Sequence, residues 1–147
     1  MKGILFFLLV GLTLTYNADA AIKYAREYCK RYNYKYYNYR NQGGDCANFV
    51  SQCLIAGGES LSGCTGLDKR GAIPGVTNLE NCLISKGWSF SVGINGHFKQ
   101  GFPFFYHGEH AMIATAVNGH YLKYCGHTND RCDENLEASN SYYYYYK

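Results

Sequence analysis

One segment, residues 43–58, constrains the fold more than any other part of the chain, because a glycine pair stands at each end of a helical apolar pattern. The apolar positions recur at the spacing of one helix face: Cys46, Phe49, Val50, Cys53 and Leu54. Gly43 and Gly44 are poor helix formers, and Gly57 is typical of a helix end. The sequence therefore predicts a short helix that begins at Cys46 and buries one face.

The first turn of this predicted helix is a favourable place for a reactive cysteine. Asp45 is a good N-cap, and the unpaired backbone N–H groups and the helix dipole favour an anion at Cys46. With a cationic neighbour, such a site lowers the pKa of a thiol from its usual value of about 8.5. We expect Cys46 to be a nucleophile. The alternative is a buried core cysteine or half of a disulfide.

The N-terminal residues 1–20 have the pattern of a secretory signal peptide. One lysine precedes an apolar run, and Ala18-Asp19-Ala20 forms a small-x-small cleavage site. The apolar run is shorter than the roughly 20 residues that a membrane-spanning helix needs. We therefore expect an exported single domain, residues 21–147, with no membrane association after cleavage.

The seven cysteines of the chain all lie within this expected domain. In an oxidising compartment six of them can form three disulfides, and one is left over. We expect the unpaired one to be Cys46. Cys125 and Cys132 lie close together in the sequence around His127, so we expect them to pair with each other.

The order of the predicted elements is helices first and strands afterwards. Residues 21–32 have a helical pattern, which predicts a helix before the one that begins at Cys46. Thr77 to Glu80 form a capping box, which predicts the start of a further helix that ends at Gly87. The turn signal Asn118-Gly119 joins two β-prone runs into a hairpin. This order predicts an α+β fold with an antiparallel sheet.

The segment from Gly43 to Leu54 resembles the signature of the putative amidase domain family, a branch of the NlpC and CHAP papain-like cysteine hydrolases. Residues 109–114 and 127–131 support the resemblance further along the chain. It implies a papain-like fold, N-terminal helices packed on an antiparallel β-sheet, and hydrolysis of amides without a cofactor.

Histidine suits the role of base for a cysteine nucleophile near neutral pH. His110 stands at the start of the first hairpin strand, where papain-like hydrolases carry their base. Counting through the turn places residues 126–129 on the partner strand near His110. The resemblance makes His127 the first choice for the group that orients the base, because the similar families carry a His, Asn or other polar residue here, and Asn129 is the alternative.

Further residues are expected to line the site. The backbone N–H of Cys46, next to Asp45, is a candidate for the oxyanion hole. The resemblance implies that a tyrosine before the Gly-Gly-Asp-Cys run helps to form the site, and Tyr37 and Tyr39 are similarly placed.

Four other interpretations compete with this one. A zinc site near His107 and His110 lacks the His-Glu-x-x-His spacing, so we expect no metal. The net charge of +3 without a recognised motif argues against nucleic acid as a partner. A non-catalytic secreted module that binds carbohydrate or cell wall stays open, as does an acyltransferase. We expect a monomer that cleaves peptide amides of peptidoglycan.

Overall fold

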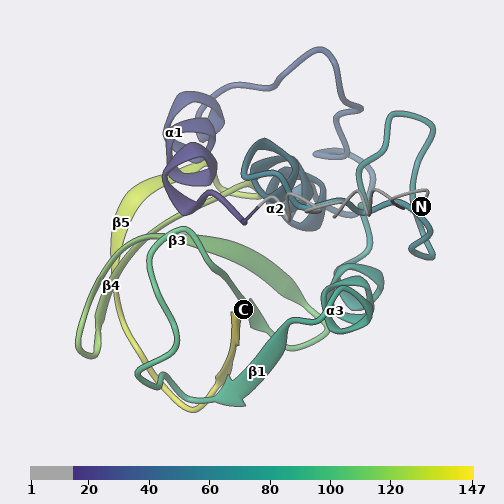
Figure 1. The fold of residues 1–147 in the computed structure, drawn as a ribbon. Coiled ribbons are helices and arrows are strands. Elements are labelled where there is room, and N and C mark those ends of the chain that lie inside the picture. The colour runs from purple at the N-terminus through teal and green to yellow at the C-terminus, as the bar shows by residue number, and fades with distance from the viewer. Residues whose placement is uncertain (1–14) are drawn as a thin grey trace, which may run out of the picture.

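The computed structural model describes residues 15–147, and it has the expected α+β architecture with helices first (Figure 1). Within this range the helices are α1 (Ala18–Tyr28), α2 (Cys46–Ala56) and α3 (Val76–Ser85). The strands are β1 (Ser89–Val92), β2 (Pro103–Tyr106), β3 (His110–Asn118), β4 (Tyr121–Gly126), β5 (Arg131–Glu137) and β6 (Tyr142–Tyr146). They form one antiparallel sheet in the order β1-β6-β2-β3-β4-β5.

Helix α2 is the central helix of the structure: it lies between α1 and α3 and packs against β3 of the curved sheet (Figure 1). The predicted apolar face is buried: Cys46, Phe49, Val50, Cys53 and Leu54 are all less than 9% exposed. The sequence predicted that α2 buries only one face, but Asn48, Ser51 and Gln52 outside that face are buried as well. Each of these side chains makes a hydrogen bond inside the protein, while Oδ1 of Asn48 is buried without a partner among the described residues.

The sheet curls strongly, and its two faces bury different parts of the protein. On one face Phe105 and Tyr145 lie toward the helices, and the Tyr145 hydroxyl donates to Glu80 of α3. On the other face Phe104 and Tyr144 stack at 5.7 Å between ring centroids, and Phe98 from the β1–β2 connection packs against both rings. The aromatic residues of the second half thus fill both sides of the sheet.

The predicted hairpin is confirmed, with a small shift in its turn. Strands β3 and β4 pair so that Asn118 faces Tyr121, which makes Gly119 and His120 the two loop residues. Gly119 has a φ of 59°, the conformation that glycine adopts most readily. Asn118-Gly119 correctly predicted the position of the hairpin, but Asn118 is the last residue of β3 and not part of the loop.

The predicted capping box of α3 is wrong. The helix begins at Val76 with Gly75 as its N-cap, and no side chain caps it. Glu80 is 4% exposed and accepts hydrogen bonds from residues outside the helix instead. The expected end of this helix is confirmed, since Gly87 follows it with a φ of 89°.

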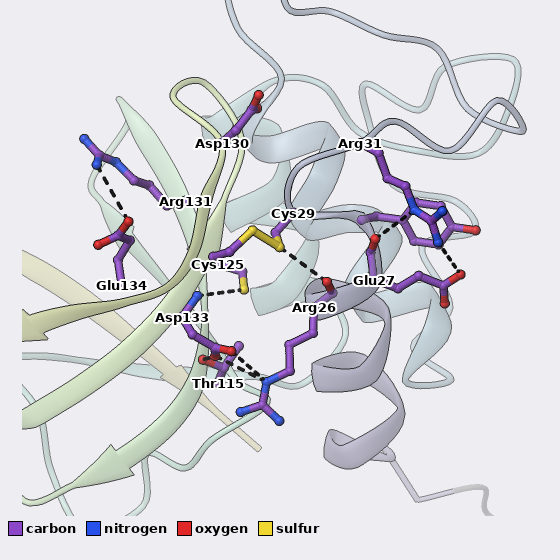
Figure 2. The surroundings of a disulfide bond; sticks show 12 residues. Arg26, Glu27, Cys29, Arg31, Thr115, Cys125, Asp130, Arg131, Asp133 and Glu134 are labelled. Atoms are coloured by element: carbon purple, nitrogen blue, oxygen red, sulfur yellow. Dashed lines mark hydrogen bonds and ion pairs between the residues drawn. A yellow bond between two sulfur atoms is a disulfide. The ribbon is translucent and has the colours of Figure 1, made fainter.

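Two disulfides are present among the described residues, Cys29–Cys132 and Cys64–Cys82. The predictions of three disulfides and of a bond between Cys125 and Cys132 are therefore both wrong. Cys132 joins strand β5 to the end of α1, while the Cys125 sulfur accepts a hydrogen bond of 3.4 Å from the Asp133 amide (Figure 2). Cys46, Cys53 and Cys125 are free and buried.

The folded domain includes residues before Ala21, the expected start of the mature chain. Residues 1–14 of the predicted signal peptide lie outside the described residues. The Tyr16 hydroxyl donates to the Gly101 carbonyl at 2.7 Å, and its ring packs against Trp88. The Asn17 amide donates to the Gly57 carbonyl, and its side chain caps α1. Cleavage after Ala20 would remove all of these contacts. Within residues 15–147 no helix has the length and hydropathy to cross a membrane.

We expect Tyr16→Ala to lower the free energy of unfolding by about 3 kcal/mol, the usual cost of emptying an aromatic site in a core. Asn17→Ala should cost about 1 kcal/mol, because it removes an N-cap. Urea unfolding measures both, with Tyr34→Ala as the control, since Tyr34 is 86% exposed. Equal effects at Tyr16 and Tyr34 would show that the N-terminal residues contribute nothing to the fold.

Candidate functional site

The candidate site begins with the glycine pair that leads into α2. Gly43 and Gly44 have φ values of 96° and 108°, a region that other residues rarely adopt. A side chain on Gly44 would also lie 3.1 Å from the Thr128 hydroxyl. The backbone conformation therefore favours glycine at both positions, and the close approach of the β4–β5 connection restricts Gly44 further.

Asp45 occupies the N-cap position of α2, but its side chain does not cap the helix. The carboxylate is fully buried and accepts hydrogen bonds from the Tyr39 amide at 2.8 Å and the Asn48 side chain at 2.9 Å. Its other oxygen lies 2.6 Å from Nδ1 of His127. Asp45 thus ties two other segments, the one around Tyr39 and the one around His127, to the start of the helix.

His127 lies where the strand count placed it, just beyond the end of β4, but its ring nitrogens have other partners than His110. Nδ1 lies 2.6 Å from Oδ2 of Asp45, and Nε2 donates to the Tyr28 carbonyl at 2.7 Å. The ring is 1% exposed and stacks on Phe49, with 4.0 Å between centroids. These contacts join α1, α2 and the β4–β5 connection, which is a structural role.

Cys46 lies in the first turn of α2, and its sulfur faces backbone N–H groups of Ala47, Ala111 and Cys46 itself. Burial raises the pKa of the thiol above its ordinary value, and the three N–H groups oppose this rise only in part. The negative charge of Asp45 raises the pKa further. The expectation of a lowered pKa is therefore wrong: desolvation outweighs the helix terminus here.

His110 begins strand β3, next to the residue whose amide faces the Cys46 sulfur. Burial lowers the pKa of His110 below its ordinary value of 6.5. Desolvation thus favours the neutral form of both His110 and Cys46. The start of β3 thus lies beside Cys46, but in the described part of the chain the His110 side chain has no hydrogen-bond partner, Cys46 included.

The expected tyrosines lie beside the start of α2. The Tyr39 hydroxyl donates to Asp68 at 3.0 Å, and burial together with that carboxylate raises the pKa of Tyr39 to about 12. The Arg70 guanidinium lies 4.3 Å from the centre of the Tyr37 ring, which is 38% exposed. These contacts hold the tyrosine segment in place near Cys46.

Asn129, the alternative orienting residue, is exposed in the β4–β5 connection and has a φ of 137°. The sequence analysis missed its neighbour Thr128, whose hydroxyl accepts a hydrogen bond from the Asp45 amide at 3.3 Å. It also missed Asn48, which bonds both Asp45 and the Tyr37 carbonyl. Asn48 lies inside the segment that was read only for its apolar spacing.

No group of three or more His, Cys, Asp or Glu side chains in residues 15–147 is arranged to hold a metal ion. The histidines and cysteines near the hairpin instead bond different partners. Cys132 is in a disulfide, His127 bonds Asp45, and His107 bonds Glu80.

Comparison with known families adds an independent observation. The model of the putative amidase domain matches residues 15–91, more than half of the chain. The chain belongs to the putative amidase domain family. No match was found among curated proteins or among solved structures.

The amidase-domain match bears on the site in a specific way. It includes the glycine pair, Asp45 and Cys46, and it begins at Thr15, close to the first residue with contacts to the fold. It ends at Ser91, before His110 and His127. The family thus supports amide hydrolysis as the activity, while the roles of the two histidines stay predictions.

The raised pKa predicts slow alkylation of Cys46 at neutral pH. The rate with iodoacetamide should keep increasing with pH above 9, because only the thiolate reacts. Cys53 and Cys125 are 0% exposed and should react only after unfolding. Mass spectrometry should therefore find three free thiols in the denatured, unreduced protein. A rate that levels off below pH 8 would contradict the burial argument.

The Asp45–His127 pair should be important for stability. Asp45→Asn and His127→Ala should each lower the free energy of unfolding by about 3 kcal/mol, because each leaves a buried partner uncompensated. The double variant should lose much less than the sum, since both changes remove the same contact. Glu137→Gln is the control, because Glu137 is exposed. Additive losses would show that the two residues act independently.

Proposed function

We propose that this member of the putative amidase domain family is a secreted cysteine-dependent amide hydrolase of the papain-like NlpC and CHAP type. The observation that carries the proposal is the placement of Cys46. It begins a buried helix, its sulfur faces three backbone N–H groups, and one of these belongs to Ala111, directly after His110.

The proposed reaction starts from an uncharged pair, because burial favours the neutral forms of both Cys46 and His110. His110 accepts the thiol proton as the sulfur attacks the amide carbonyl. The N–H groups at the start of α2 stabilise the negative oxygen of the tetrahedral intermediate. His110 then returns the proton to the leaving amine, and a thioester remains on Cys46. Water hydrolyses that thioester and regenerates the thiol.

Peptide amides of bacterial peptidoglycan are the proposed substrate, in line with the resemblance to cell-wall hydrolases. The two disulfides among the described residues are compatible with an oxidising extracellular compartment. We propose that the protein acts as a monomer, without a cofactor, and after removal of a signal peptide that ends before Tyr16, because Tyr16 and Asn17 make contacts within the fold.

The experiment is incubation of the purified protein with peptidoglycan fragments and identification of new termini by mass spectrometry. Cys46→Ala and His110→Ala should each remove nearly all turnover, whereas a metal chelator should have no effect. The acid limb of kcat/KM should lie below pH 6.5, because activity needs neutral His110 and burial lowers its pKa.

Cys53→Ala is the matched control, since Cys53 is a second buried free thiol away from the start of the helix. Full activity of Cys46→Ala would refute the proposal. Transfer of the acyl group to an added amine in place of hydrolysis would identify the alternative, an acyltransferase.

A further inference from the structure

The contacts of Glu80 are unexpected for a helix residue with a carboxylate. Glu80 lies in the middle of α3 and is only 4% exposed. A buried carboxylate is costly unless hydrogen-bond donors surround it. Glu80 has three of them, and all come from the sheet and its loops, none from α3 itself.

Two of these donors lie in the turn between β2 and β3. The Gly108 amide donates to Oε1 at 2.8 Å, and Nδ1 of His107 donates to Oε2 at 2.9 Å. The third donor is the Tyr145 hydroxyl of β6, at 3.0 Å from Oε2. One carboxylate therefore holds the turn against both α3 and the sheet.

The turn itself is short and closely defined. The Glu109 amide donates to the Tyr106 carbonyl at 2.9 Å, and Gly108 has a φ of 72°. The His107 ring stacks on Tyr143 with 4.5 Å between centroids. Gly108 lies only two residues before His110, and Tyr106 is the cross-strand partner of His110. The backbone of His110 therefore follows any movement of this turn.

We propose that Glu80 is a positioning residue for His110: it fixes the β2–β3 turn by its bonds to His107 and Gly108 and so holds His110 against the start of α2. The inference rests on the proposed function for its catalytic consequence, because only there does His110 act as the base. Displacements of about 1 Å in an active site can cost on the order of 100-fold in rate.

The test compares Glu80→Gln with Glu109→Gln. Glu109 is in the same turn, but it is exposed and its carboxylate has no hydrogen bond in the described part of the chain. Glu80→Gln should lower kcat by about 10- to 100-fold while KM changes less than threefold. Glu109→Gln should leave both constants within twofold of the wild type.

A third variant separates positioning from general stability. Tyr145→Phe removes one hydrogen bond to Glu80 but keeps both bonds to the turn. It should lower the melting temperature with little change in kcat. An equal loss of kcat in Tyr145→Phe and Glu80→Gln would overturn the proposal.

A measurement without substrate keeps the proposal distinct from the proposed function. NMR titration of the His110 ring reports its surroundings directly. Burial lowers the pKa of His110, so a turn released in folded Glu80→Gln should let that pKa rise toward 6.5. An unchanged titration would refute the positioning role, whatever the activity. A changed titration in a protein that hydrolyses no peptidoglycan would instead refute the proposed function alone.

Discussion

The buried contact between Asp45 and His127 is the interaction on which the site depends most. Asp45 accepts hydrogen bonds from the Tyr39 segment, from Asn48 of α2 and from His127 after β4. Nε2 of His127 also donates to the Tyr28 carbonyl at the end of α1. A charge pair in a core is stable only when its remaining hydrogen-bonding groups are satisfied, and here each atom has a partner from a different element. The contact thereby fixes where α2 begins.

The position of Cys46 follows from this arrangement, and so does its chemistry. A helix N-terminus and a neighbouring cation each stabilise a thiolate, whereas burial favours the neutral thiol. Cys46 is buried and lies next to the negative charge of Asp45. Both effects raise the pKa of its thiol, so the neutral form is favoured. Burial acts in the opposite direction on His110 and favours the neutral imidazole. In the reaction proposed above, the base would therefore be unprotonated near neutral pH before it accepts the thiol proton.

A disulfide attaches α1 to the sheet, and a buried carboxylate attaches α3 to it. Cys29–Cys132 joins the end of α1 to β5, and the Arg26–Asp133 ion pair, at 3.1 Å, lies beside it (Figure 2). Glu80 joins α3 to β6 and to the turn before His110. The exposed ion pair contributes little to stability on its own, whereas the covalent bond restricts the unfolded chain over a long loop.

The sequence by itself determined the elements whose signals are local. The periodicity from Cys46 to Leu54 and the turn at Gly119 correctly gave α2, the hairpin and the α+β class, because such patterns depend on spacing along the chain. The partners of side chains were decided only by the tertiary structure. Asp45 and Glu80 both have the local pattern of helix caps, yet each carboxylate bonds groups far away in the sequence, because burial makes distant donors available to it. Cys132 pairs with Cys29 and not with its neighbour Cys125 for the same reason: the fold, and not sequence distance, sets which atoms meet.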